Sequence, residues 1–389
     1  MMIMRNAGEK RLQNFVTTFC ALFFALFSFT FVAVYKSPLL QIVYDNVATG
    51  RLEYDGWVVS GILTAILVGL ALWMNRFAKF QREWTAMAFL PSAFILAFVT
   101  DIDRSIFTGE KSYAVWGWVL LISLFLYLFL SFVLHRVLFE KIKNPTMAAN
   151  RIVWRNLILF VLLFAGVGAL SGGDRSFMCE AIQYRLFKEG NVDEAVLVGK
   201  HYTSASQELT AQSTFLLSLK GKLGDKIFEY PNNFGAEGLL PSVKQSSPIA
   251  SDTIYAHIGF ERERGETALN YLARAAGDDS SQLTAREYYL VALLAECRLV
   301  DFVDKVFEYY DMGDYVDMPK HYKEALLLYS YVVQDYDLPD ADAAMLSSFE
   351  ALVKELKKSG SAIFDDMRCY SQYGSTYWWY YLSLTPVSF

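Results

Sequence analysis

The chain has 389 residues, of which 54% are apolar, 16% aromatic and 20% charged. Soluble domains carry about 45–50% apolar and about 25% charged residues, so this composition excludes a wholly soluble protein and a disordered one. The charge is also divided: residues 1–170 have a net charge of +6 and residues 171–389 a net charge of −12. This division excludes a single globular domain and a nucleic-acid binder with a basic surface.

Five apolar runs before residue 171 predict five membrane-spanning helices, each of which needs roughly 20 apolar residues. The predicted spans are 15–35, 57–74, 85–100, 113–134 and 156–170. None of them contains an acidic or basic residue, which argues against a proton- or ion-coupled transporter. We therefore expect a helical anchor in which small residues let the helices approach closely. The glycines expected to do so are Gly61, Gly69, Gly166 and Gly168.

The charges of the loops predict the orientation of these spans, because Lys and Arg are retained on the cytoplasmic side. The N-terminal tail and the second and fourth loops are basic, whereas the first and third loops, the first including Lys36, are acidic overall. An N-terminus in the cytoplasm and five crossings then leave residues 171–389 outside the cytoplasm.

Residues 171–389 show helical periodicity and few strand signals. In the clearest unit, 181–195, a helix ends at Gly190 and a second helix follows. This pattern resembles the tetratricopeptide repeat. A second copy turns at Gly265, and a third, degenerate copy covers residues 293–302. Leu299 follows Gly265 at a distance of 34 positions, which matches the period of about 34 residues of this repeat. The sequence thus predicts an all-α protein: a five-helix transmembrane bundle, 1–170, followed by a tetratricopeptide-like α-solenoid.

Two further stretches carry a resemblance to a known family. They are 219–231, continuing to 238–241, and the aromatic tail 376–382. Both are similar to an uncharacterised family of Bacteroidota integral membrane proteins with several N-terminal spans and a repeat-like C-terminal domain. The resemblance implies a bacterial inner-membrane protein whose C-terminal domain faces the periplasm, and it transfers no catalytic residues.

The cysteines and histidines, which could bind metals or form disulfides, show no pattern typical of such a site. Cys179, Cys297 and Cys369 in the outer half form no CxxC motif, and an odd number leaves one thiol over. We interpret them as unpaired core residues, and a disulfide between two of them stays open. The four histidines lack zinc-ligand spacing, so no metal and no cofactor is expected.

The preferred hypothesis is a membrane-anchored scaffold that binds another protein of the cell envelope and is not an enzyme. The tail aromatics are either a cap on the last repeat or an exposed docking patch, and the 235–241 loop is a second candidate surface. The candidate binding residues in the tail are Tyr377, Trp378, Trp379 and Tyr380.

The alternative hypothesis is a membrane enzyme of envelope assembly that acts on a lipid-linked substrate, for example by glycosyl transfer. Asp101, Asp103 and Arg104 would lie at the membrane face in that case, since a DxD pair can hold a metal in glycosyltransferases. Solvated acids on an outer loop are the simpler interpretation of the same residues.

Overall fold

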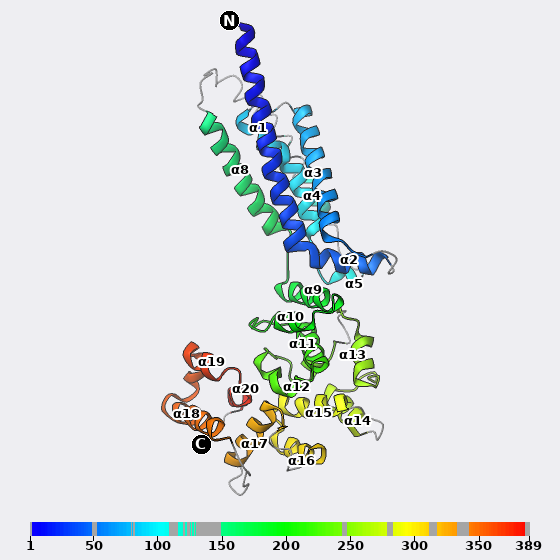
Figure 1. Ribbon diagram of the computed structural model, residues 1–389, viewed down its shortest axis with the longest axis vertical. Helices are drawn as coiled ribbons and strands as arrows, with labels where there is room; N and C mark the ends of the chain where they lie inside the picture. Colours follow the sequence, from blue (N-terminus) through cyan, green and yellow to red (C-terminus); the bar gives the residue numbers. More distant parts are fainter. Residues whose placement is uncertain are drawn as a thin grey trace. The chain divides into compact units, whose positions relative to one another are not determined.

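The computed structural model describes residues 2–48, 53–78, 80, 82–108, 116–119, 121–122, 125, 127, 129, 149–242, 247–277, 283–310, 317–332 and 342–385. The chain divides into two compact units, Met1–Asp174 and Arg175–Phe389, here called the membrane unit and the outer unit. All regular structure in the described ranges is helical, so the protein is all-α (Figure 1).

The membrane unit is built from long apolar helices. Its elements are α1 (Met2–Thr30), the π-helical η1 (Phe31–Lys36), α2 (Ser37–Ala48), α3 (Gly56–Ala78), the 3₁₀ segment η2 (Arg82–Phe89), α4 (Leu90–Thr100), α5 (Ser105–Thr108) and α8 (Ala149–Leu170).

In the part of the chain that the structure describes, three helices are long and apolar enough to cross a membrane, so this is a multi-pass membrane protein. They are Arg11–Ala48, Gly56–Phe77 and Asn150–Leu170, which contain the predicted spans 15–35, 57–74 and 156–170. Trp84–Thr100, over the predicted span 85–100, is a shorter apolar helix. Most of the predicted span 113–134 lies outside the described residues.

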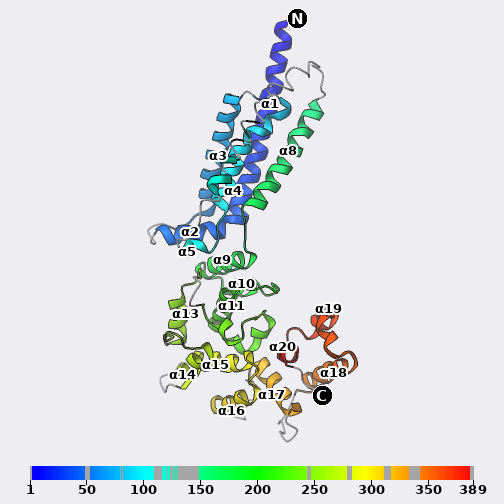
Figure 2. The same ribbon diagram turned by 180° about the vertical axis from the view of Figure 1, so that it is seen from behind.

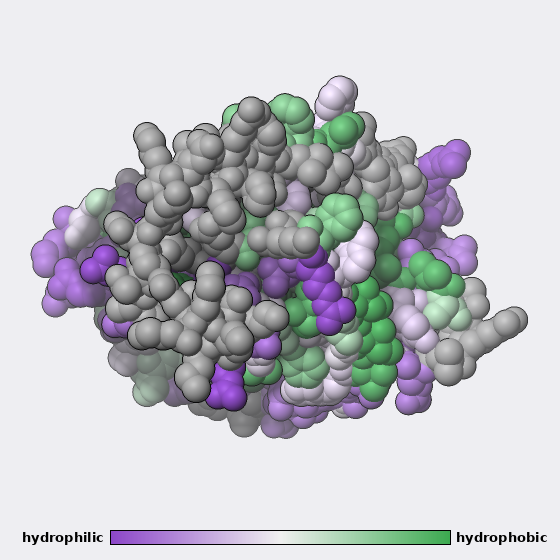
Figure 3. Space-filling view, turned by 90° about the horizontal axis from the view of Figure 1, so that it is seen from above, coloured by the Kyte–Doolittle hydropathy of each residue, from purple (hydrophilic) through white to green (hydrophobic). Residues whose placement is uncertain are grey.

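The membrane unit exposes large apolar side chains, as is typical of a protein surrounded by lipid. Large apolar residues such as Leu26, Ile62 and Leu162 are exposed, and apolar side chains reach the outer surface in Figure 3. The buried Ser92 is hydrogen-bonded, because its Oγ donates to the carbonyl oxygen of Leu67 at 2.8 Å. Exposed apolar surface is favourable in hydrocarbon, where unpaired polar groups are costly.

The described part of the membrane unit shows no close packing at the four glycines that were expected to let the helices approach. No described atom lies within 4 Å of a Cβ placed on Gly61, Gly69, Gly166 or Gly168. Aromatic rings bring the helices together instead: the ring centroids of Phe27 and Phe164 are 3.6 Å apart. In the described part of the membrane unit, aromatic side chains therefore fill the space between α1 and α8.

The outer unit consists of shorter helices around one apolar core (Figures 1 and 2). Its elements are α9 (Arg175–Lys188), α10 (Val192–Leu197), α11 (Gln207–Leu219), α12 (Leu223–Lys226), η4 (Ile227–Glu229), η5 (Gly235–Leu239), α13 (Ser251–Ile258), α14 (Ala268–Gly277), α15 (Leu283–Ala295), α16 (Leu299–Tyr309), α17 (Lys320–Val332), α18 (Ala343–Ser359), η7 (Gly360–Asp365), α19 (Met367–Tyr373) and α20 (Tyr377–Leu384).

One turn recurs three times between consecutive helices. Gly190, Gly221 and Cys297 adopt the left-handed conformation, with φ of 77°, 61° and 56°. In each case the next backbone N–H donates to a carbonyl five residues back, which satisfies the end of the preceding helix. These bonds are Asn191 to Leu186 at 2.8 Å, Lys222 to Leu217 at 2.9 Å and Arg298 to Leu293 at 2.8 Å. Cys297, and not Leu299, therefore takes the turn position in the third copy.

We predict that Gly190→Ala and Gly221→Ala each destabilise the outer unit by about 1–2 kcal/mol, the cost of a left-handed conformation for a residue with a Cβ. No described atom lies within 4 Å of either new Cβ, so the effect isolates backbone conformation. The measurement is the urea midpoint of the purified full chain, followed by circular dichroism.

Gly277→Ala is the matched control, because Gly277 lies at the end of α14 without a positive φ and with equally open surroundings. It should leave the midpoint unchanged or raise it slightly. Equal midpoints for all three variants would contradict the assigned turns.

Candidate functional site

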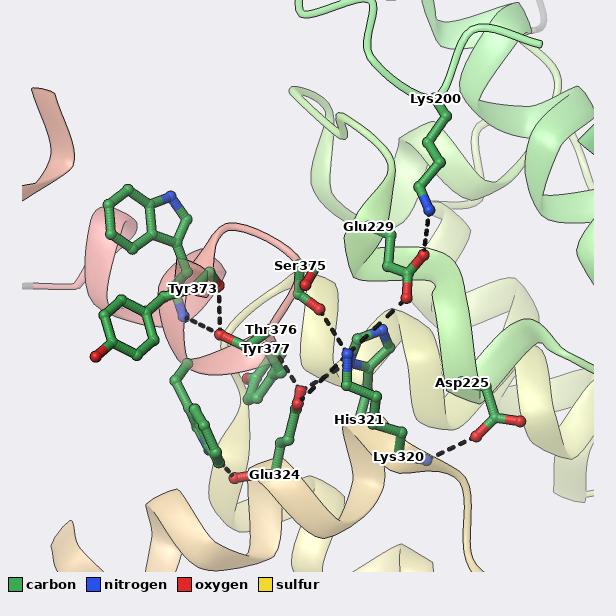
Figure 4. Close-up of polar contacts among 12 residues, drawn as sticks. Lys200, Asp225, Glu229, Lys320, His321, Glu324, Tyr373, Ser375, Thr376 and Tyr377 are labelled. Carbon is green, nitrogen blue, oxygen red and sulfur yellow. Dashed lines mark hydrogen bonds and ion pairs between the residues drawn. The ribbon is translucent and has the colours of Figure 1, made fainter. Parts of the chain in front are cut away.

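A cluster of charged residues joins α17 to the preceding helices of the outer unit. This charge cluster consists of Lys200, Glu229, Lys320, His321 and Glu324 (Figure 4). The last three lie on the first turns of α17. Lys320 and Glu324 are four positions apart, so they lie on one side of the helix.

Glu324 is the most buried acid of this cluster, with only 2% of its side chain exposed. Its Oε2 accepts hydrogen bonds from the backbone N–H of Tyr377 at 2.7 Å and lies 2.8 Å from Nδ1 of His321. The negative charge thus faces the N-terminus of α20, where the helix dipole favours it. Trp378 Nε1 donates to the main-chain oxygen of Glu324 at 2.7 Å.

Lys320 links two acids and the tail. Its ammonium lies 3.8 Å from Glu324 Oε1 and 3.9 Å from Glu229 Oε1, and it donates to the carbonyl of Ser375 at 2.9 Å. Glu229 is held from its other side by Lys200 at 2.5 Å. At the start of α17 the backbone N–H of Lys320 donates to Asp225 Oδ1 at 2.7 Å, which caps the helix.

The four tail aromatics proposed as binding residues lie in the structure as core residues. The exposed fractions of Tyr377, Trp378 and Trp379 are 0%, 2% and 8%, and Tyr380 is partly buried. The hydroxyls of Tyr377 and Tyr380 donate to the last carbonyls of α15, at 3.3 Å and 2.8 Å. Their burial favours the interpretation of the tail as a cap over that of an exposed docking patch.

The 235–241 loop is also packed inward. Ala236 and Leu239 are buried, and the backbone N–H of Ala236 donates to Glu296 Oε1 at 2.7 Å. Phe234, directly before it, is 43% exposed. The loop therefore joins α11 and α15 and offers little surface of its own.

The charge cluster positions helices rather than reacting groups. His321 is fully buried, and its Nε2 has no hydrogen-bond partner among the described atoms. A buried imidazole beside a carboxylate resembles a general-base pair, but catalysis needs access to a substrate. The pair instead sits under the N-terminus of α20, so its observable effect is to fix the tail.

A second polar site closes one end of the membrane unit. Lys36, expected in the first outer loop, lies inside the continuous helix and is 1% exposed. Its ammonium donates to the carbonyls of Ser171 at 2.8 Å and Gly172 at 3.0 Å, at the C-terminal end of α8. A cation at this position stabilises the negative end of the helix dipole.

The residues of the enzyme hypothesis lie near this end of the membrane unit. Asp101 Oδ2 accepts a hydrogen bond from Trp116 Nε1 at 2.6 Å, whereas Asp103 caps its own loop by accepting from Ser105 N at 2.9 Å. Arg104 lies 3.9 Å from Asp174. Among the described residues, no group of three or more His, Cys, Asp or Glu could hold a metal. The four cysteines are free thiols.

One segment of the chain matches a known family. Residues 263–383, from before α14 into α20, match the Family of unknown function (DUF6057). This match includes the aromatic tail, whereas the other stretch that carried a resemblance, 219–241, lies outside it. No curated protein and no solved structure matches the chain.

Sequence analysis missed Lys36 and the His321–Glu324 pair. The i, i+3 spacing of the pair on a helix was a usable signal, since such residues face each other. Lys36 was assigned to a loop because its apolar run ends there. Only the tertiary contact with α8 shows why a lysine is tolerated at that position.

We predict that Glu324→Ala destabilises the outer unit by about 3 kcal/mol or more, because removing one partner leaves buried polar groups unpaired. Loss of the Tyr377 contact should also loosen α20 and redshift the emission of Trp378 and Trp379. Glu308→Ala is the control: Glu308 is 55% exposed and pairs only with Lys305 on the same helix. It should change stability by less than about 1 kcal/mol, and equal losses in the two variants would contradict the assigned role of Glu324.

We also predict that acid below about pH 6.5 weakens the outer unit through His257. Burial lowers the pKa of His257 below its ordinary value of 6.5, and its ring packs on Phe215 with Nε2 3.0 Å from Ser218 Oγ. As the pH falls through about 6.5, the unfolded chain binds a proton before the folded one, so the free energy of unfolding decreases.

The measurement compares urea midpoints at pH 7.5 and 5.5 for the natural chain, His257→Gln and His201→Gln. His257→Gln should lose less stability on acidification than the natural chain. His201 is exposed, so its variant should behave as the natural chain does. The same loss in all three would assign the acid sensitivity to other groups.

Proposed function

We propose that this protein is a membrane-anchored, tetratricopeptide-like scaffold of the bacterial inner membrane that binds another envelope protein on the periplasmic side. The observation that supports it most is the outer unit's repeated helix–turn–helix construction. Stacked helical repeats present extended surfaces for peptides and helices, and they need no catalytic group.

The packing of α9 against α11 supports a repeat. Ser176 and Ser206 are 2.8 Å apart, and Gln183 Nε2 donates to Ser213 Oγ at 2.9 Å. Both pairs join residues 30 positions apart, so the two helices pack in a constant register. That spacing is close to the 31 positions between the turn glycines Gly190 and Gly221, and to the period of about 34 residues of tetratricopeptide repeats.

The arrangement of the loops supports a cytoplasmic N-terminus. The acidic loop after α4 and the end of α8 share one end of the membrane unit through the Arg104–Asp174 pair. At the basic loop after α3, Gln13 Nε2 donates to the carbonyl of Phe80 at 3.5 Å, so that loop lies beside the N-terminal part of α1. Acidic and basic loops therefore lie at different ends, as the positive-inside rule favours.

The proposed partner carries a basic segment, because the residues after 170 have a net charge of −12. Complementary charge would speed association and make it sensitive to salt. The second helices of two repeats carry exposed apolar side chains beside acids, Leu197 in α10 at 65% and Val300 in α16 at 58% exposed.

Photo-crosslinking in living cells tests the proposal. Benzoylphenylalanine at Leu197 or Val300 should give a discrete protein adduct that weakens with added salt. The same probe at Ile62, on the lipid-facing side of α3, is the control and should give no such adduct. Adducts at Ile62 alone, or none with a protein at either outer position, would contradict the scaffold.

The orientation has its own test. In a background in which Cys20, Cys179 and Cys369 are alanine and Cys297 is glycine, Leu197→Cys should react with a membrane-impermeant maleimide in cells whose outer membrane has been permeabilised, without lysis of the inner membrane. Labelling of Leu197→Cys only after lysis of the inner membrane would overturn the periplasmic assignment.

A further inference from the structure

The helix that begins the membrane unit is too long for a bilayer. The apolar run Arg11–Ala48 has 38 residues in α1, η1 and α2. At 1.5 Å per residue it would extend about 57 Å, against a hydrocarbon core of roughly 30 Å. A large part of this run must therefore lie outside the hydrocarbon.

The neighbouring helices show where the run leaves the hydrocarbon. Lys36 Nζ binds the carbonyls of Ser171 and Gly172, directly after α8 ends. Ser37 Oγ lies 3.4 Å from the hydroxyl of Tyr54, directly before α3 begins. α3 and α8, beside α1, thus start or stop at the level of Lys36, whereas α2 continues beyond it.

The direction of the run changes at the same level. The π-helical segment η1 covers Phe31–Lys36, and Pro38 follows in the first turn of α2. π-helical turns and prolines are the usual causes of a bend, because each interrupts the regular hydrogen bonds of the helix. In both Figure 1 and Figure 2, α2 runs sideways from the end of α1 instead of continuing along it.

The surface of α2 changes along its length. Pro38, Leu39, Gln41 and Ile42 are buried, whereas the far end is exposed, with Val47 at 76%. Leu40, Val43, Tyr44 and Val47 recur at i, i+3, i+4 and i+7, so they form one apolar stripe. None of these four is fully buried, so the apolar stripe lies on a side that the membrane unit does not cover completely.

We propose that α2 is an interfacial helix whose apolar stripe is seated among the headgroups and upper acyl chains of the bilayer. The bilayer is the expected partner of this stripe, because α2 extends directly from a membrane-spanning helix at the level where the hydrocarbon ends. Aromatic residues gather at this level, with the rings of Tyr44 and Tyr54 5.7 Å apart and Trp57 66% exposed. Such residues prefer the membrane interface.

The test measures the depth of single nitroxide labels on the full chain, reconstituted into phosphatidylethanolamine–phosphatidylglycerol nanodiscs. The background replaces Cys20, Cys179 and Cys369 by alanine and Cys297 by glycine. The labelled variants are Val47→Cys on the apolar stripe, its exposed neighbour Asn46→Cys as the matched control, and Leu26→Cys on the lipid-facing side of α1. Collision rates with oxygen and with a water-soluble nickel chelate report depth.

The oxygen-to-nickel ratio at Val47 should exceed that at Asn46 severalfold and remain below that at Leu26. Equal ratios at Val47 and Asn46, with high nickel rates, would mean that α2 projects into water. Low rates with both reagents at Val47 would mean that protein covers the apolar stripe, and a ratio equal to that at Leu26 would mean that α2 belongs to the span. Each of these three results overturns the proposal. Val43→Cys repeats the test if the Val47 variant does not fold.

Discussion

The unpaired carbonyl groups at the C-terminal ends of helices are the constraint on which much of this structure depends. Each helix leaves its last carbonyls without an intrahelical donor. In the membrane unit, Lys36 supplies the donors for the end of α8 from 135 residues earlier in the chain. In the outer unit, Tyr380 supplies a donor for the last carbonyl of α15, and Tyr377 adds a second donor to the carbonyl of Leu294, which also accepts from the Cys297 N–H. Satisfying these ends therefore joins segments that are distant in sequence.

The same constraint explains the tail. Its aromatic side chains combine apolar area with a hydroxyl or an indole N–H, so they fill the core and still reach main-chain oxygens. Glu324 completes the arrangement by accepting the first N–H of α20. The segment that matches a known family thus folds back onto itself through α15, α17 and α20, and its tail acts as a structural closure.

This segment also depends on residues before it. Asp225 caps α17, and Glu229 holds Lys320. Gly224 lets the two segments approach closely: a Cβ there would lie 2.7 Å from Cβ of Pro319, which is too short for packed atoms. The helices before residue 263 therefore form part of the same folding unit, even though the family match does not include them.

The sequence by itself determined what depends on composition and on local periodicity. Apolar runs located the long membrane helices, and Gly190 marked a real turn, because length, hydropathy and a left-handed glycine act within a few residues. Tertiary structure alone decided which residues those helices bury. From the sequence alone, Lys36 could not be told from a loop lysine, and Tyr377 and Trp378 could not be told from an exposed patch. The physical reason is that each role is set by a partner far away in the chain, and periodicity carries no information about that partner.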